Sequence, residues 1–288
     1  MVWYFWMVIE VRYVSWSKDL GDYFYTRFPI TQFIPLAIFL SLAGLAVSSP
    51  AQPLPWLVAS ILSLSLVLQF RIWDDIADRD LDRVTHPERV LPHTQYMHLF
   101  FIIAAALFVM NGILVYWYQD NSTRAAGYLV LSVSLLTWYR LRPNVLSTSL
   151  LNSLVILAKY SVIAWLISSP VADTDLMLFF SCLFSVYLIF IIFEVLDDTN
   201  LQQQTGARFS FALSFPFLIL TWIYIALLIK PHSDLLHWLI WIALIFSTLI
   251  LGISGMSFLR LGLVNRSRQG FFVVGLLAYL TVAVESKI

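Results

Sequence analysis

Charged residues are scarce in this sequence. Aspartate, glutamate, lysine and arginine make up 12% of the 288 residues, whereas hydrophobic residues make up 60%. A soluble domain carries about 25% charged residues, so this composition argues against an ordinary soluble enzyme and excludes a disordered chain. Positive and negative side chains are equal in number, so no overall field favours nucleic acid and no nucleic-acid partner is expected.

Several sequence patterns of common enzymes are also absent. The chain has a single cysteine, Cys182, which excludes an internal disulfide framework and, within an apolar run, is expected to pack in the interior. There is no Walker phosphate loop, no dinucleotide-binding glycine pattern and no G-x-S-x-G sequence, so the corresponding nucleotide-binding folds and serine hydrolases are not indicated. The histidines have no spacing that would indicate a zinc site.

Long apolar runs dominate what is present. A bilayer core of roughly 30 Å needs about 20 apolar residues per helix, and nine runs of about this length contain few charges. They cover residues 29–48, 54–72, 95–117, 123–140, 145–168, 175–195, 209–229, 234–258 and 270–285. We therefore predict an all-α polytopic membrane bundle of nine transmembrane helices, with residues 1–288 forming a single membrane-embedded domain in the lipid bilayer.

The segment before the first run, residues 1–28, is predicted to be cytoplasmic or interfacial. Its beginning, from Met1 to Ile9, is apolar and aromatic. No basic segment precedes these residues and no small-residue cleavage site follows them, so we do not predict a signal peptide. Tryptophan is frequent in the segment, which favours an anchor at the membrane surface.

Lysine and arginine are distributed unequally between the two predicted sides of the membrane. The side with the N-terminus and the loops after spans 2, 4, 6 and 8 carries thirteen of the seventeen, and the other side carries three. Because positive loops stay in the cytoplasm, we predict that this side is cytoplasmic in a multi-pass protein of the plasma (inner) membrane. Twelve of the seventeen acidic residues lie on the same side, which the positive-inside rule does not explain.

An aspartate-rich segment follows the second run. Asp74, Asp78 and Asp82 have four-residue spacing, with Asp75 beside the first, so these carboxylates share one face if the segment is helical. A cluster of oxygen ligands without histidine or cysteine suits a hard divalent cation, above all magnesium. The alternative is a solvated acidic loop whose charge is balanced by neighbouring arginines.

A second acidic segment ends the sixth run. Glu194, Asp198 and Gln202 also have four-residue spacing, and Asp197 is adjacent. An ionisable group at the end of an apolar helix is costly and usually functional, although these residues could simply end the span. Because spans 2 and 6 end on the same predicted side, the two acidic segments are expected to face each other across one cavity mouth.

Cationic side chains accompany these carboxylates. Arginine matches phosphate oxygens geometrically, and the cytoplasmic loops contain Arg79, Arg89, Arg142 and Arg208. Their alternative role is to set the topology. Lys159 differs, because it lies well inside the fifth run and is expected to face the bundle interior, paired with an acid or an anionic ligand.

These residues resemble the UbiA-type membrane prenyltransferase superfamily. The first motif of that family is N-D-x-x-D-x-x-x-D, and residues 74–82 follow it with Asp74 in place of the leading asparagine. His86-Pro87-Glu88-Arg89 stands where the family has a later R-P-like segment. The second motif, D-x-x-x-D followed by glycine, corresponds to Asp198, Gln202 and Gly206, with an amide at the second position. Residues 138–142 loosely resemble a tyrosine-and-lysine segment of the family, with arginine in place of lysine.

The resemblance implies a nine-helix bundle around a central cavity and an isoprenyl diphosphate substrate bound with two magnesium ions. It implies catalytic roles for Asp78, Asp82 and Asp198. The implied metal ligands are Asp74, Asp75, Asp78, Asp82, Glu194, Asp197, Asp198 and Gln202. The implied diphosphate-binding residues are Arg79, Arg89, Arg142, Lys159 and Arg208. The expected activity is magnesium-dependent transfer of an isoprenyl group to an aromatic, quinone-precursor or other lipophilic acceptor.

Three other functions remain open on the sequence. A membrane terpene cyclase of the same superfamily would ionise the prenyl diphosphate without an acceptor. A non-catalytic membrane protein would bind cations or lipid head groups, and Gln202 would then record lost catalysis. An alcohol transferase of phospholipid synthesis also uses carboxylates and a divalent metal, but its D-G-x-x-A-R pattern is missing.

Overall fold

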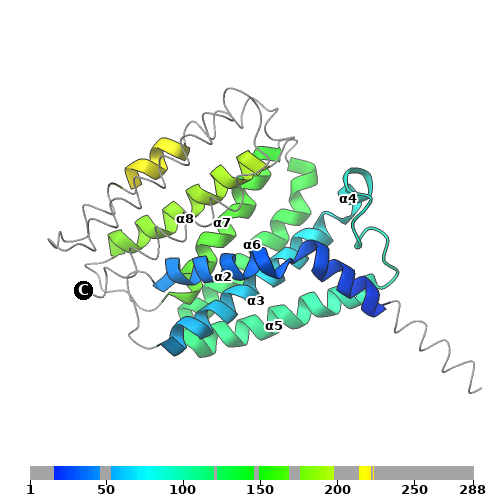
Figure 1. The fold of residues 1–288 in the computed structure, drawn as a ribbon, viewed down its shortest axis with the longest axis horizontal. Helices are drawn as coiled ribbons and strands as arrows, with labels where there is room; N and C mark the ends of the chain where they lie inside the picture. The colour runs from blue at the N-terminus through cyan, green and yellow to red at the C-terminus, as the bar shows by residue number, and fades with distance from the viewer. Residues whose placement is uncertain are drawn as a thin grey trace, which may run out of the picture.

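A computed structural model describes residues 16–45, 53–119, 122–145, 149–168, 176–197, 214–221 and 223. These residues form helices joined by turns and contain no strand (Figure 1). The first helix is Trp16–Arg27, and a short helix covers 214–221. Between them lie α2 (Ile30–Leu45), α3 (Pro53–Ala77), α4 (Arg79–Thr85), α5 (Met97–Gln119), α6 (Ser122–Val145), α7 (Ser149–Ile167) and α8 (Leu176–Asp197).

The long helices pack side by side, and hydrogen bonds between them define their directions (Figure 1). Two bonds join α3 to α5, two join α6 to α7 and two join α7 to α8. In each pair the bond that comes later in one helix comes earlier in the other, so these neighbours are antiparallel. The helices α3 and α6 run in the same direction. The bonds are Ser65–Asn111 and Tyr118–Pro55, Trp138–Asn152 and Arg124–Trp165, Ser161–Leu183 and Tyr187–Leu154, and Tyr128–Gln69 and Tyr139–Asp74.

One consequence of these directions is that particular helix ends gather together. The C-terminal ends of α3, α6 and α8 lie at the same end of the bundle as the N-terminal ends of α5 and α7. We call this the acidic end, because α3 finishes there with Asp74 and Asp75 and α8 finishes there with Glu194 and Asp197. The backbone therefore places the described residues of the two acidic segments at one end of the bundle, as expected.

The first six predicted spans coincide with α2, α3, α5, α6, α7 and α8. Within the described ranges, two helices are long and apolar enough to cross a membrane, Leu54–Ala77 and Met97–Tyr118. A third span results if Trp16–Arg27 and α2, which are bent by 60° at a short break, are counted together. In α7 and α8 the apolar stretches are shorter, Asn152–Ile167 and Phe179–Ile192. The eighth and ninth predicted spans lie outside the described residues, so nine spans stays a prediction.

Two local sequence features explain where helices end. Pro29 separates the helix Trp16–Arg27 from α2, since proline has no N–H to donate and disfavours helical geometry in the preceding residue. The α3 helix continues five residues beyond the predicted end at residue 72. The added turn carries Asp74 and Asp75, and both find partners of opposite charge, which lowers the cost of placing carboxylates there.

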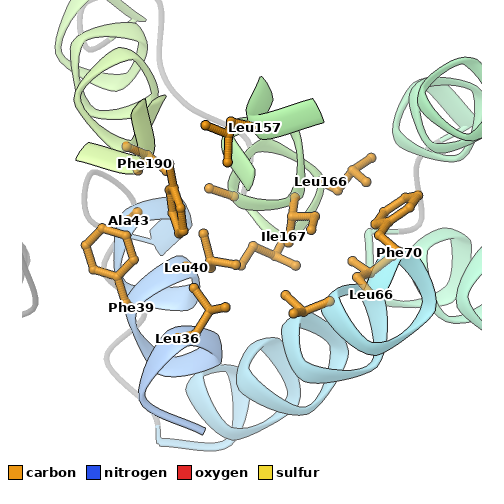
Figure 2. Packing of buried hydrophobic residues seen from close by; sticks show 14 of the residues in the cluster. Leu36, Phe39, Leu40, Ala43, Leu66, Phe70, Leu157, Leu166, Ile167 and Phe190 are labelled. Carbon is orange, nitrogen blue, oxygen red and sulfur yellow. The ribbon is translucent and has the colours of Figure 1, made fainter. Parts of the chain in front are cut away.

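The interior is formed mainly by α2, α3, α7 and α8. Figure 2 shows side chains such as Leu40, Leu66, Ile167 and Phe190 meeting between these helices. Cys182 is fully buried among them, as expected from its apolar run. By contrast, the outer faces of α5 and α6 expose many large apolar side chains, which fits contact with lipid and would be unfavourable in water. They include Phe101, Ile102, Val109, Ile113, Trp117, Leu129, Val130, Val133 and Leu136.

Close helix contacts occur at the end of the bundle opposite the acidic end. A Cβ atom added to Gly44 of α2 would lie 2.4 Å from the carbonyl oxygen of Ala164 and 2.7 Å from Cγ1 of Ile167, both on α7. A Cβ atom on Gly127 of α6 would lie 2.3 Å from Cζ3 of the Trp165 ring. Glycine at these positions lets α7 approach both neighbours closely, as small residues do in membrane bundles.

We expect Gly44→Ala to lower the free energy of unfolding by about 1–3 kcal/mol, because the new methyl group meets a backbone carbonyl that cannot turn away. Gly21→Ala is the matched control, since an added Cβ there meets nothing within 4 Å, and its effect should be neutral or stabilising by about 0.4–1 kcal/mol. Denaturant unfolding in detergent micelles measures both variants. If Gly44→Ala and Gly21→Ala had equal stabilities, α2 and α7 would not be closely packed at Gly44.

Candidate functional site

The acidic segment spans a break between α3 and α4. Asp78 lies between the helices with φ −89° and ψ 0°, yet helical hydrogen bonding continues through it. The backbone N–H groups of Asp78, Asp82 and His86 donate to the carbonyl oxygens of Asp74, Asp78 and Asp82, at 2.9, 2.7 and 2.8 Å. The backbone is therefore helical across the four-residue spacing of Asp74, Asp78 and Asp82. The carboxylates nevertheless have different surroundings.

Asp74 points into the bundle. Its carboxylate accepts hydrogen bonds from Lys159 Nζ of α7 and from the Tyr139 hydroxyl of α6. The Lys159 side chain is 4% exposed and that of Asp74 is 14% exposed. A buried ammonium group is strongly unfavourable without a partner, so this ion pair accounts for a lysine inside an apolar helix. Lys159 thus lies in the interior and pairs with an acid, as its position in the fifth run predicts.

Asp75 points in another direction, toward the helix Trp16–Arg27. Its Oδ2 atom accepts from the Tyr23 hydroxyl at 2.9 Å and from Arg27 Nε at 3.2 Å, and Arg27 Nη2 donates to Oδ1. Arg71 Nε lies 3.4 Å from the same Oδ2 atom. The Asp75 side chain is only 5% exposed. Three hydrogen bonds from two side chains and an ion pair with a third therefore surround this carboxylate.

Asp82 is buried on α4. Its Oδ1 atom lies 2.5 Å from Arg89 Nη1 in the following loop, and the side chain is 4% exposed. Asp80, by contrast, is 90% exposed and lies 3.5 Å from Arg83. Four of the five aspartates of the segment therefore face different surroundings: the bundle interior, the N-terminal helix, the loop after α4 and the surface.

The loop between α4 and α5 is held by two arginines of α4. Arg79 Nε donates to the Leu91 carbonyl at 3.2 Å, and Arg83 Nε donates to the Pro92 carbonyl at 3.3 Å. The exposed Glu88 accepts a hydrogen bond from its own backbone N–H and contacts His86, and these interactions hold the pKa of its carboxyl below the ordinary value. Of the predicted diphosphate-binding residues, Arg79 and Arg89 thus contact groups of the protein.

The second acidic segment is described only in part. The helix α8 ends at Asp197 and includes Glu194, so the backbone brings both residues to the acidic end. Their side chains, like that of Arg142 near the end of α6, are not described. Asp198, Gln202 and Arg208 lie outside the described residues. The roles predicted for these six residues stay predictions.

The described carboxylates differ in how well they suit magnesium. Within the described part of the chain, no three histidine, cysteine or acidic side chains converge as a metal site. A carboxylate accepts about four hydrogen bonds, and protein donors already surround Asp75. Asp74 and Asp78 fit better, because they supply oxygen ligands one helical turn apart and magnesium prefers such ligands. A complete ligand set would draw its further oxygens from the end of α8.

Three cations surround the last two carboxylates of α3. The carboxylates of Asp74 and Asp75 face Arg27, Arg71 and Lys159. All three cations lie on helices and are at most 30% exposed, so water screens their charge less than at an open surface. Such an arrangement suits an anionic ligand with several oxygen atoms, such as a phosphate or diphosphate.

Sequence analysis did not assign Tyr23, Arg27, Arg71 and Tyr139 to the site, although the structure brings them to it. A signal in the four-residue spacing was present for three of them. Tyr23 and Arg27 are four residues apart and share a face of one helix, in a segment where apolar anchoring was the main expectation. Arg71 is similarly four residues before Asp75, which is favourable spacing for a helical ion pair.

The buried pair of Asp74 and Lys159 gives a double-mutant prediction. Lys159→Met should lower the free energy of unfolding by about 3 kcal/mol, because Asp74 then loses its cation. Adding Asp74→Asn removes the second charge and keeps an acceptor for the Tyr139 hydroxyl, so the double variant should regain more than half of that loss. Denaturant unfolding in micelles tests both variants. Equal destabilisation of single and double variants would contradict the pairing.

Comparisons with known proteins identify the fold. No protein-family model and no curated protein sequence matches this chain. Among solved structures, the chain is similar to a structure of digeranylgeranylglyceryl phosphate synthase in membranes. That enzyme is a UbiA-type membrane prenyltransferase. The TM-score is 0.59 at 13% sequence identity, and the match covers 94% of this chain and 100% of the other. The resemblance seen in the acidic motifs therefore extends to the architecture: the chain has the fold of a UbiA-type membrane prenyltransferase.

Proposed function

We propose that this protein is a magnesium-dependent membrane prenyltransferase that transfers an isoprenyl group from an isoprenyl diphosphate to a lipophilic acceptor. One observation carries the proposal: a carboxylate-rich helix end with three partly buried cations occurs in a chain with a prenyltransferase fold. A diphosphate head group needs cations and metal-binding oxygens, and an isoprenyl tail needs apolar surroundings. The acidic end of an apolar bundle offers both.

The cations provide the first part of the chemistry. In the proposed complex, Lys159 and Arg71 donate to diphosphate oxygens from within the bundle, while Arg79, Arg89, Arg142 and Arg208 contribute from the loops. Asp74 and Asp78, with Asp198 and the acidic end of α8, would hold two magnesium ions, which would supply positive charge to the leaving diphosphate.

The transfer step then breaks the bond between C1 of the isoprenyl chain and the bridging diphosphate oxygen. The electron pair leaves with the diphosphate, and C1 forms a new bond to a nucleophilic atom of the acceptor, which loses a proton. Positive charge on the allylic carbons is stabilised by aromatic faces. Such faces lie beside the site, since the rings of Tyr160 and Phe190 stack at 3.9 Å and Lys159 Nζ lies 5.4 Å from the Tyr160 ring centre.

The apolar helices and the fold indicate a membrane protein. We further propose that the acidic end faces the cytoplasm at the plasma (inner) membrane, because most lysines and arginines lie in loops on that predicted side. A cytoplasmic site would receive a water-soluble diphosphate head group and magnesium directly. The acceptor would reach it from the bilayer.

The test uses purified protein in micelles with magnesium and a panel of prenyl diphosphates, with and without membrane extract, read by mass spectrometry. The name of the structural neighbour makes geranylgeranyl diphosphate and a glyceryl phosphate acceptor sensible members of the panel. We expect a prenylated acceptor and released diphosphate, and no product after magnesium is removed with a chelator. A cyclic hydrocarbon from the donor alone would instead support a terpene cyclase. Magnesium-dependent binding without turnover would support a non-catalytic protein.

Asp78→Ala and Asp198→Ala should each reduce diphosphate release below detection, because each removes a proposed magnesium ligand. Asp80→Asn is the matched control from the same acidic run, since its side chain is 90% exposed, and it should retain wild-type activity. Wild-type rates in both alanine variants would refute the proposed magnesium site.

A further inference from the structure

The helix Trp16–Arg27 presents one polar face to the rest of the protein. Asp19, Tyr23 and Arg27 follow each other at four-residue intervals, and side chains at this spacing lie on the same side of a helix. Each of them contacts a residue from a distant part of the chain. The remaining surface of this helix is largely exposed, as at Asp22 and Tyr25.

The first attachment of this helix is the carboxylate of Asp75. Tyr23 and Arg27 together supply three donor atoms to it, and Arg71 approaches it from α3 itself. The forked guanidinium group of Arg27 contacts both carboxylate oxygens, a geometry that fixes orientation as well as supplying energy. The Tyr23 side chain is fully buried, and its ring meets the edge of Phe100 at 5.3 Å.

The second attachment is to the loop that follows α4. The Thr94 hydroxyl donates to Asp19 Oδ2 at 2.6 Å and accepts from the Tyr96 N–H at 3.1 Å. The helix Trp16–Arg27 is thus connected to the end of α3 on one side and to the segment before α5 on the other. These two places flank the acidic segment and the loop that Asp82 and Arg89 hold together.

Fixing Asp75 also fixes its neighbour. Successive residues of an α-helix point about 100° apart, so a helix turned to present Asp75 to Arg27 presents Asp74 in a different direction. In the structure that direction leads to Tyr139 and Lys159. The attachment of the N-terminal helix therefore determines which way the proposed magnesium ligand Asp74 faces.

We propose that the helix Trp16–Arg27 is a strap that positions the acidic segment, with Asp75 as its anchor rather than a magnesium ligand and with Tyr23 and Arg27 as positioning residues. The positioning role rests on the proposed function, because it concerns the orientation of Asp74 in that site. The assignment of Asp75 as an anchor rests on its contacts alone. The two statements are tested by separate measurements.

The first measurement is amide hydrogen exchange of residues 16–27 in the full-length protein in micelles. Asp75→Asn and Arg27→Ala each cut the same attachment and should speed exchange of this segment at least tenfold, since a buried hydrogen bond to a charged group is lost. Arg27→Lys keeps one charge and should recover part of the protection. Asp80→Asn, the exposed control, should leave exchange unchanged. Unchanged exchange in Asp75→Asn and Arg27→Ala would show that these contacts do not hold the helix Trp16–Arg27 in place, and would overturn the proposal.

The second measurement is the concentration of magnesium that half-saturates its effect on the apparent Tm, without any substrate. If Asp75 is an anchor, Asp75→Asn and Arg27→Ala should weaken magnesium binding by similar factors, and the double variant should be no worse than either single one. If Asp75 is instead a ligand, Asp75→Asn should weaken binding while Arg27→Ala, which frees the carboxylate, should not. Weaker magnesium binding in Asp75→Asn but not in Arg27→Ala would overturn the assignment of Asp75 as an anchor.

Tyr23→Phe provides a milder variant that keeps the buried ring and removes one hydroxyl group. It should fold even where the charge variants do not, and it should speed exchange of residues 16–27 by about fivefold. If the wild type transfers prenyl groups, Tyr23→Phe and Arg27→Lys should lower kcat with little change in KM for the prenyl diphosphate. An unchanged kcat with faster exchange would overturn the positioning role. Absence of turnover in the wild type would refute the proposed function. The hydrogen-exchange result would then still decide whether Asp75 anchors the helix Trp16–Arg27.

Discussion

The balance between two adjacent carboxylates and three cations at the end of α3 is the interaction on which the site depends. Asp74 and Asp75 are nearly buried, and neither would be stable there as an isolated charge. Each therefore brings a different part of the chain to α3: Asp74 brings α6 and α7, and Asp75 brings the N-terminal helix. The contacts that assemble the acidic end are therefore the same ones that neutralise Asp74 and Asp75.

This balance also bears on how the proposed ligands would bind. Protein cations already compensate Asp74 and Asp75, so a magnesium ion at Asp74 would compete with Lys159 for the carboxylate. A diphosphate that arrives with magnesium brings negative charge for both the metal and the cations. The observed pairs around Asp74 and Asp82 are then contacts that ligand binding would have to rearrange, with Lys159 and Arg89 exchanging carboxylate oxygens for phosphate oxygens.

The sequence was informative where the signal was local. The apolar runs predicted six helices that the structure contains. The four-residue spacing of Asp74, Asp78 and Asp82 predicted a shared face if the segment is helical, and helical hydrogen bonds do run through it. The position of Lys159 inside an apolar run predicted a buried partner. The partners of Asp75 were not predictable in this way, because Arg27 and Tyr23 are 48 and 52 residues away. Pairing across such separations depends on how helices pack, and no spacing rule within one helix contains that information.

The glycine contacts at the opposite end give the bundle an asymmetry along its length. Gly44 and Gly127 hold α2 and α6 tightly against the last turn of α7, where any widening would break close packing. Displacements that pivot about the glycine contacts are therefore smallest there and grow toward Tyr139 on α6 and Lys159 on α7, the two residues that contact Asp74.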